Sequence, residues 1–398
     1  MRKILLAFIF ITGIHSAMAD TWTQKASLSY TIVRAASFSI GDSGYICTGA
    51  SGNSKLNALW KYDPGMDAWT QKADCGGPAR MDAVGFSIGN KGYVGTGWNG
   101  TTFFNDFWEY DPADNSWTSK SPFPGGARQS AIGFGLGTKG YIGGGVNSGF
   151  IFFADFWEYD PVSGFWINRT DIPNATAKGT AFSSGNYGYL GLGENDNGNL
   201  KTFYQYDPSS HNWTSLADFG GAAVEGASGF SIGSYGYIGT GYASSNRSDF
   251  WQYDVVADTW AQVTSLPASA RSNAVGFNIG NKGYIGTGTP GLSDFWEYRP
   301  DPLSVKERSI AGVSIYPNLV RDQFTVRNEK IENKPVLIIY NMLGERVLCP
   351  AFQNGSSKEE TVFDATGLGK GLYIVVLQNS YDIAGNGSTL HTARFIKE

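Results

Sequence analysis

The sequence predicts an all-β protein: a six-bladed β-propeller closed by its own N-terminal strand, followed by a small C-terminal β-sandwich. The 398 residues include 53 glycines, about twice the usual share, and 15% of the residues are aromatic. Three sequence signals recur six times each at spacings of 45 to 49 residues, and this period stops near residue 300. Glycine without a three-residue period, interleaved with aromatic side chains that need burial, is typical of short strands joined by tight turns.

The chain begins with the pattern of a secretion signal. Arg2 and Lys3 give a positive start, residues 4–14 are almost wholly apolar, and residues 17–19 read Ala-Met-Ala, a typical cleavage site. We therefore expect residues 1–19 to be removed as a signal peptide and the mature chain to begin at Asp20. The apolar stretch is shorter than the ~20 residues of a membrane-spanning helix, and no later segment qualifies, so the mature chain is expected to lack a transmembrane segment.

Each repeat carries three signals in a fixed order: a glycine-rich turn and strand (GNKGYVGTG at residues 89–97), an aromatic strand (FWEYDP at residues 107–112), and a tryptophan after a polar turn. The marker residues are Tyr45, Tyr93, Tyr141, Tyr189, Tyr237 and Tyr284 for the first signal, Trp60, Trp108, Trp157, Tyr204, Trp251 and Trp296 for the second, and Trp22, Trp69, Trp117, Trp166, Trp213 and Trp260 for the third. With the inner strand that precedes each glycine turn, every repeat reads as four short strands, the unit of one propeller blade.

The register of the repeats predicts how the ring closes. Trp22 lies in a fourth-strand sequence, because TWTQKA around it nearly repeats AWTQKA around Trp69, yet it precedes the first inner strand. The last repeat has its Tyr284 and Trp296 strands but no tryptophan strand after them. We therefore expect residues 21–25 to supply the outer strand of the sixth blade, which leaves no exposed end strand between the first and last repeats.

The order of these signals resembles the kelch repeat, which forms one β-propeller blade of about 50 residues. The resemblance covers residues 20–300, although the double glycine of the kelch pattern is complete only at residues 143–145. In kelch proteins, arginines near the start of the inner strand line the channel mouth and bind acidic partners. The resemblance implies this role for Arg80, Arg128 and Arg271, which stand six residues before the inner-strand phenylalanine. Pairing with a nearby carboxylate such as Asp82 is the structural alternative.

The variable loops are expected to share one face, because the loops between second and third strands and the connectors between blades lie at the same end of a propeller. These loops follow Gly97, Gly145, Leu192 and Gly241. Trp98 is the one tryptophan outside the repeated signals, and we interpret it as a stacking platform for a sugar ring. Packing within its own loop is the alternative, since aromatic rings are often buried for packing alone.

Composition and motifs exclude several kinds of chemistry. Residues 20–300 carry 17 Lys and Arg against 24 Asp and Glu with no basic stripe, so nucleic-acid binding is not expected. The copper-radical oxidases of kelch architecture use two histidines, whereas His211 is the only histidine in this region. Walker, Rossmann and zincin motifs and the repeated turns of sialidases are absent, so no catalytic residue, metal site or cofactor is expected. The cysteines, Cys47, Cys75 and Cys349, are odd in number and far apart, which argues against a disulfide framework.

A different kind of sequence follows residue 300. Residues 301–313 read as a linker, and residues 314–398 as a sandwich of alternating strands separated by Gly, Asn and Ser. This region resembles the C-terminal sorting domain of the type IX secretion system of Gram-negative bacteria, although Leu319 replaces a proline and Glu398 follows the last lysine. The residues that carry the resemblance are Tyr316, Pro317, Asn318, Gly344, Gly371, Tyr373 and Lys397.

The sorting resemblance implies export across both membranes, contact with the type IX secretion machinery, and a final location outside the cell or on the outer-membrane surface. An ordinary accessory sandwich is the alternative for residues 314–398. For the propeller we favour a binding module that recognises a glycan or a protein through its loop-rich face, and a non-enzymatic role. A glycan-active hydrolase or lyase on the same scaffold is the alternative.

Overall fold

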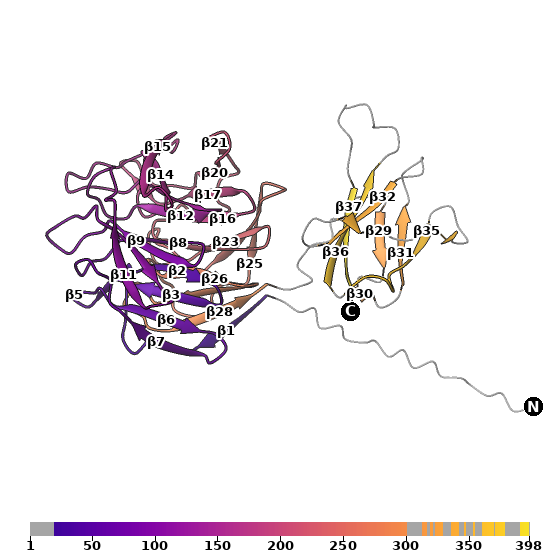
Figure 1. The fold of residues 1–398 in the computed structure, drawn as a ribbon, viewed down its shortest axis with the longest axis horizontal. Coiled ribbons are helices and arrows are strands. Elements are labelled where there is room, and N and C mark those ends of the chain that lie inside the picture. Colours follow the sequence, from indigo (N-terminus) through magenta and orange to yellow (C-terminus); the bar gives the residue numbers. More distant parts are fainter. Residues whose placement is uncertain are drawn as a thin grey trace, which may run out of the picture. The chain divides into compact units, whose positions relative to one another are not determined.

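The computed structural model describes residues 20–300 without interruption, and beyond them residues 313–316, 319–320, 323–328, 336–341, 346–347, 353–354, 360–369, 371–378 and 391–397. The chain divides into two compact units, Met1–Ser304 and Val305–Glu398 (Figure 1). The expected signal peptide at residues 1–19 and most of the expected linker lie outside the described residues, so both stay predictions.

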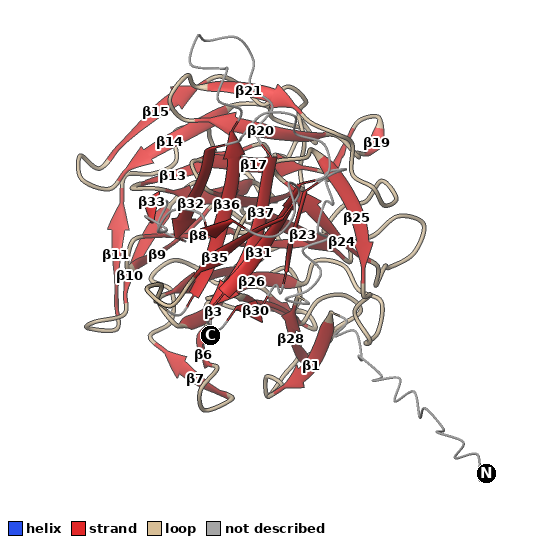
Figure 2. Ribbon diagram, turned by 90° about the vertical axis from the view of Figure 1, so that its right-hand side faces the viewer, coloured by secondary structure: helices blue, strands red, loops and turns tan. Residues whose placement is uncertain are grey.

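The first unit is a six-bladed β-propeller made of six four-stranded antiparallel sheets (Figure 2). The first five blades are β2 (Ala36–Ile40), β3 (Ser43–Cys47), β6 (Leu59–Asp63) and β7 (Ala68–Lys72); β8 (Val84–Ile88), β9 (Lys91–Gly95), β10 (Phe107–Asp111) and β11 (Ser116–Lys120); β12 (Ile132–Leu136), β13 (Lys139–Gly143), β14 (Phe156–Asp160) and β15 (Phe165–Arg169); β16 (Thr180–Ser184), β17 (Tyr187–Gly191), β20 (Phe203–Asp207) and β21 (Asn212–Ser215); and β22 (Ser228–Ile232), β23 (Tyr235–Gly239), β24 (Phe250–Asp254) and β25 (Thr259–Val263). Two loops add small hairpins, β4 (Ala50–Ser51) with β5 (Ser54–Lys55), and β18 (Glu194–Asn195) with β19 (Gly198–Asn199).

The sixth blade is closed by the N-terminal strand, which confirms the prediction from the register. It consists of β26 (Val275–Ile279), β27 (Lys282–Gly286), β28 (Phe295–Arg299) and β1 (Thr21–Lys25). β1 runs antiparallel to β28, with Thr21 opposite Arg299 and Lys25 opposite Phe295. The ring of sheets is therefore held shut by a strand pairing between residues that are almost 280 positions apart in the chain.

Neighbouring blades touch through the glycines of their second strands. In each blade the phenylalanine of the inner strand lies against a glycine of the next blade, so that a Cβ on Gly188, for example, would lie 2.2 Å from the ring of Phe134. A side chain larger than hydrogen cannot fit there unless the two sheets move apart. The six pairs are Phe38 with Gly92, Phe86 with Gly140, Phe134 with Gly188, Phe182 with Gly236, Phe230 with Gly283, and Phe277 with Gly44.

The tryptophan ladder ties the outer parts of the blades together. Each third-signal indole donates a hydrogen bond to a backbone carbonyl that lies one repeat earlier, and the last of these bonds closes the circle from Trp22 to Thr264 at 2.8 Å. The other donors are Trp69, Trp117, Trp166, Trp213 and Trp260, to the carbonyls of Ala26, Ala73, Ser121, Thr170 and Ala217. Five of these six rings pack edge-on against a phenylalanine, which fills the wedge between adjacent blades with aromatic contacts; Trp117 is the exception, because Leu59 stands at that position in the first blade.

The second unit contains two further sheets among its described residues. One sheet has the order β29 (Val313–Tyr316), β31 (Gln323–Asn328), β35 (Glu360–Asp364) and β34 (Gln353–Asn354). The other has the order β30 (Leu319–Val320), β37 (His391–Lys397), β36 (Gly371–Gln378), β32 (Val336–Asn341) and β33 (Arg346–Val347). The regular secondary structure among the described residues of this unit is all β, as predicted; the sandwich packing of the two sheets stays a prediction.

Candidate functional site

One end of the propeller carries all the long connections. The bridge between Met81 and Trp98 places the connector before β8 beside the loop after β9, and equivalent bridges recur in the other blades. The opposite end holds the tight turns, such as the turn at Gly89 between β8 and β9. The mouth at the loop-bearing end is therefore the place where side chains can vary without disturbing the blades.

A ring of six residues forms the floor of this mouth. Each stands four positions before the inner-strand phenylalanine, and each has a positive φ between 51° and 60°. Its members, called the inner ring from here on, are Arg34, Asp82, Ser130, Lys178, Gly226 and Asn273. The backbone N–H of each donates to the carbonyl of the previous member, at 2.8 to 3.2 Å, and the circle closes from Arg34 to Asn273. The backbone N–H groups of the inner ring thus have their hydrogen-bond acceptors within the ring. Its side chains are not needed for these bonds and line the space around the propeller axis.

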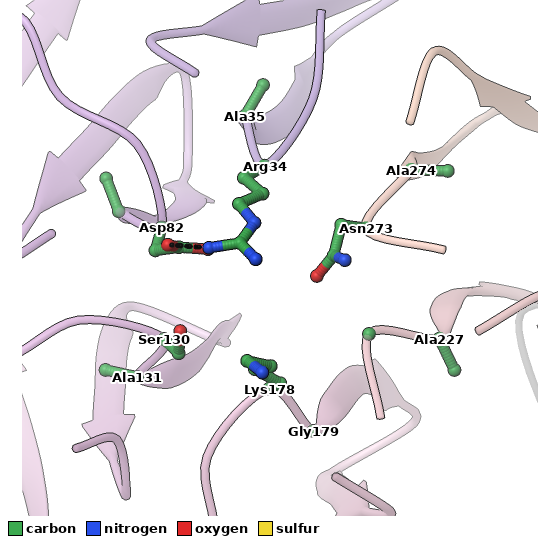
Figure 3. A pocket seen from close by; sticks show the side chains of 12 residues that line it. Arg34, Ala35, Asp82, Ser130, Ala131, Lys178, Gly179, Ala227, Asn273 and Ala274 are labelled. Atoms are coloured by element: carbon green, nitrogen blue, oxygen red, sulfur yellow. Dashed lines mark hydrogen bonds and ion pairs between the residues drawn. The ribbon is translucent and has the colours of Figure 1, made fainter. Parts of the chain in front are cut away.

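A cavity of ≈ 120 Å³ lies at the centre of the inner ring (Figure 3). It is lined by the inner ring together with the small residue that follows each member, either alanine or glycine. Small-molecule sites are usually ~300–1,000 Å³. The cavity is therefore sized for one terminal group of a ligand rather than for a whole molecule.

Charged side chains occupy three of the six inner-ring positions. The Arg34 guanidinium donates to the Asp82 carboxylate at 3.2 Å, and Figure 3 shows the rest of the guanidinium extending over the cavity. Burial raises the pKa of the Asp82 carboxyl, although Arg34 and Lys178 both favour its charged form. Arg34 is the most accessible of these charges, because a third of its side chain is exposed whereas only 5% of the Asp82 side chain is.

Lys178 anchors a second charged group at the edge of the cavity. Its ammonium lies 2.8 Å from Glu194 and 2.7 Å from Glu225. Burial by itself would lower the pKa of Lys178, but the two carboxylates outweigh it and hold that pKa above its usual value. Burial and a hydrogen bond with Glu225 raise the pKa of Glu194. The mouth thus combines cations and carboxylates around one small cavity.

Ser130 supplies an unused hydrogen-bonding group in the same place. Ser130 is 6% exposed and lines the cavity. Its hydroxyl has no hydrogen-bond partner among the residues that the structure describes. A buried hydroxyl without a partner costs stability, so such a group is usually met by water or by a ligand. Asn273 faces the cavity from another blade and adds an amide that can donate and accept (Figure 3).

A wider ring surrounds the mouth and includes the predicted Trp98. Its members, called the rim ring, are Ala50, Trp98, Val146, Glu194, Tyr242 and Thr289, each bridged to a residue beside the inner ring. Trp98 is half-buried, and its indole packs 6.0 Å from Phe103 of its own loop at an angle of 38°. Tyr242, on the blade opposite that of Trp98, is 42% exposed. The ligand contact predicted for Trp98 stays a prediction.

The three predicted arginines lie beneath this surface rather than on it. Arg80, Arg128 and Arg271 are completely buried. Each forms a two-pronged ion pair with a carboxylate that precedes the third strand of its blade, namely Asp106, Asp155 and Asp294, and each donates as well to nearby backbone carbonyls. Their guanidinium groups are not accessible to a ligand. This corrects the expectation that these three arginines line the channel mouth and contact an acidic partner. The structural alternative is the one observed, with these three aspartates in place of Asp82.

The backbone explains why this position matters in every repeat. The carbonyls of Arg80, Arg128 and Arg271 accept hydrogen bonds from Gly49, Gly97 and Gly241 of the preceding blade, all at 2.8 Å. Blades without an arginine make the same bond, as from Gly145 to Thr176 at 2.8 Å. The backbone at this position therefore hydrogen-bonds one blade to the next. Where the residue is arginine, its buried ion pair stabilises the same junction.

The second unit contains a domain with a known family. Residues 314–384 match the family of secretion system C-terminal sorting domains. This chain carries a secretion sorting domain. The sorting domain marks the chain for the type IX secretion machinery, so the protein is secreted or held at the outer-membrane surface of a Gram-negative bacterium. In the part of the chain that the structure describes, no helix is long and apolar enough to cross a bilayer.

Several of the predicted sorting residues can be placed in the sorting domain. Tyr316 ends β29, Gly371 begins β36, and Lys397 ends β37. Tyr373 is 7% exposed and its hydroxyl donates to the carbonyl of Gly369 at 2.9 Å. Pro317, Asn318 and Gly344 lie outside the described residues. The sorting role of the individual residues stays a prediction.

Solved structures support the fold of the propeller unit. The structure titled "Structure of YjhT" matches with a TM-score of 0.59 and 19% identity, covering 69% of this chain and 96% of that one. At this identity the likeness concerns the fold alone. None of the curated proteins matches the chain in sequence.

The inner ring was missed by the sequence reasoning, although a signal for it exists. The predicted arginines stand six residues before each inner-strand phenylalanine, and the inner ring stands two residues later. At that later position the six repeats carry five polar or charged side chains and one glycine, none of them repeated, while the next residue is always alanine or glycine. Variation at one position within an otherwise regular repeat is the sign of a surface that the fold does not constrain.

Proposed function

We propose that this secreted protein is a binding module that recognises a glycan or a protein at the mouth of its propeller. The observation that carries the proposal is the inner ring. Its backbone is fixed by six hydrogen bonds, its side chains differ in every blade, and it surrounds a cavity that holds a buried hydroxyl without a partner.

The chemistry of the cavity supports a polar terminal group as the part recognised. Arg34 and Asn273 can donate, Asp82 can accept, and the Ser130 hydroxyl can do either. These groups suit the hydroxyls or the carboxylate of a terminal sugar, or a polar side chain of a partner protein. The aromatic rings of Trp98 and Tyr242 on opposite blades offer an apolar face with a polar edge, which suits the body of the same ligand.

The proposal is tested by screening the mature chain on a glycan array and against extracellular proteins, then measuring affinity for any hit. The double variant Arg34→Ser/Asp82→Ser removes the ion pair together and gives both positions the side chain that Ser130 already has. We expect it to weaken binding at least about tenfold, or ~1.4 kcal/mol. Trp98→Ala should weaken binding of a ligand that stacks at the rim.

A matched control lies at the other end of the propeller. Asp42 is exposed in the tight turn between β2 and β3, so Asp42→Ala should leave the affinity unchanged. Equal affinity of the wild type and the two mouth variants, with all proteins equally folded, would reject the mouth as the binding site. Steady release of a cleaved product from a bound glycan would instead support the hydrolase or lyase alternative.

A further inference from the structure

Two cysteines of the first blade depart from the repeat together. Five blades carry glycine two residues after the first-signal tyrosine, where the first blade has Cys47. Six residues after the third-signal tryptophan, the other repeats carry a large apolar residue where the first blade has Cys75. The glycines are Gly95, Gly143, Gly191, Gly239 and Gly286, and the apolar residues are Leu28, Phe123, Ile172, Phe219 and Leu266.

The third blade shows how close these two positions come. A Cβ built on Gly143 would lie 3.0 Å from the Cδ1 of Ile172, the residue that corresponds to Cys75. It would also lie 2.7 Å from the ring of Phe156, and in the first blade the smaller Leu59 takes the place of that phenylalanine. The first blade therefore makes room for a side chain at position 47 and directs it toward position 75.

The structure places the two thiols against each other. Both cysteines belong to one buried cluster, Cys47 being 0% and Cys75 3% exposed. The thiols are near enough to change one another's acidity: burial and the neighbouring Cys75 raise the pKa of the Cys47 thiol, and the neighbouring Cys47 lowers the pKa of the Cys75 thiol. Cys47 is paired with Leu59 in the sheet, and the N–H of Cys75 donates to the carbonyl of Asn57 at 2.8 Å. The backbones of both cysteines are thus held against the same short segment, residues 57–59. Only a small movement of the two side chains is therefore needed before their sulfurs can form a covalent bond.

We propose that Cys47 and Cys75 are joined by a disulfide bond in the exported protein. The structure holds both as free thiols, which is the reduced form. The sorting domain sends the chain out of the reducing cytosol, and disulfides form and persist in such compartments. Packing alone would be served by any two small apolar residues, whereas two facing thiols in an oxidising compartment react.

The oxidation proceeds by thiol–disulfide exchange with a disulfide carried by an oxidant protein or a small molecule. One cysteine thiolate attacks that disulfide and forms a mixed disulfide, which releases one sulfur of the oxidant as a thiolate. The second cysteine thiolate then attacks the mixed disulfide, forms the Cys47–Cys75 bond and releases the other sulfur. Two protons leave the cysteines and the oxidant takes up two electrons, ending as a dithiol. Because both thiols are enclosed once the blade has folded, an oxidant can reach them only while the exported chain is folding.

The bond is tested by counting free thiols in the exported, full-length protein. The chain is denatured without reductant, treated with iodoacetamide, and analysed by mass spectrometry. We expect one labelled cysteine per chain, Cys349, and three after reduction. The peptides that contain Cys47 and Cys75 should appear linked, with a mass two hydrogens below the sum of the two reduced peptides.

Two variants make the result specific. Cys349→Ser should show no label before reduction and two afterwards. The double variant Cys47→Gly/Cys75→Leu, which copies Gly286 and Leu28, should show one label before and after reduction. Labelling of both Cys47 and Cys75 in the unreduced exported chain would overturn the proposal, and so would a link from either of them to Cys349. Because the labelling is done on denatured protein, a folding defect in a variant does not affect the count.

Discussion

Each buried arginine of the propeller stabilises a junction that the other blades stabilise by different means. Arg271 donates to Asp294 at 2.8 and 2.7 Å and to the carbonyl of Thr287 at 3.1 Å. In the fourth blade, the hydroxyl of Thr176 donates to the equivalent carbonyl, that of Leu192, at 2.9 Å. That blade also has a threonine, Thr202, where the arginine blades have aspartate. The fourth blade therefore replaces both partners of the ion pair with threonine, whereas the fifth blade, with Val224 at the arginine position, keeps Asp249 and pairs it with Arg247.

The pairing predicts the outcome of a mutant cycle. Arg271→Thr leaves Asp294 largely enclosed without its guanidinium, and we expect a loss of about 3 kcal/mol in the free energy of unfolding. The double variant Arg271→Thr/Asp294→Thr reproduces the fourth blade and should remain within about 1 kcal/mol of the wild type. Urea unfolding of the mature proteins measures both values. A double variant as unstable as the single one would show that the aspartate is not what makes the arginine necessary.

The same ion pair makes the propeller sensitive to acid. Burial by itself would raise the pKa of Asp294, but hydrogen bonds from Arg271 and Trp296 outweigh it and hold that pKa below its usual value. A carboxyl with a lower pKa in the folded state contributes stability above its unfolded pKa of ~3.9, and this contribution is lost as the pH falls through the folded pKa. We expect the urea midpoint to fall more steeply below about pH 4 in the wild type than in Arg271→Thr/Asp294→Thr. Parallel pH curves for the two proteins would contradict this assignment.

At the scale of elements, β1 closes the propeller, because it supplies the outer strand of the sixth blade from the other end of the chain. Trp22 in β1 packs against Phe250 at 5.1 Å and Tyr298 at 4.9 Å, so the strand fills the same aromatic wedge as its counterparts in the other blades. Without it, β28 would become an unpaired edge, the kind of surface that recruits other chains.

Deletion of Thr21–Lys25 should therefore lower the melting temperature by about 5–10 °C and promote association of the protein. Differential scanning calorimetry and size-exclusion chromatography follow the two effects. Thr23→Ala is a suitable control because Thr23 is exposed within the same strand, and it should behave like the wild type. A deletion variant that stays monomeric with an unchanged melting temperature would mean that the clasp contributes little.

At the scale of the whole molecule, the fold could be predicted from the residues that all repeats share. The inner ring could not, because its side chains differ from one repeat to the next. The spacing of the tyrosine and tryptophan markers predicted the blades, and the displaced Trp22 predicted the closure, because both depend on residues that every blade must share. The burial of Arg80, Arg128 and Arg271 depends on carboxylates that lie 23 to 27 residues further on, a pairing that no single repeat position reveals. The inner ring depends on loops brought together from six blades, and its side chains follow no common pattern.

The direction of β28 decides at which end the chain leaves the propeller. This strand begins at Phe295, next to the aspartate that pairs with Arg271 under the mouth, and ends at Arg299 beside the tight turns. The chain therefore leaves the propeller on the side away from the mouth, and a connection would have to run back along a five-residue strand, ~17 Å, to reach it. The polarity of a single strand thus fixes the end of the propeller at which its last described residues lie, opposite to the inner ring.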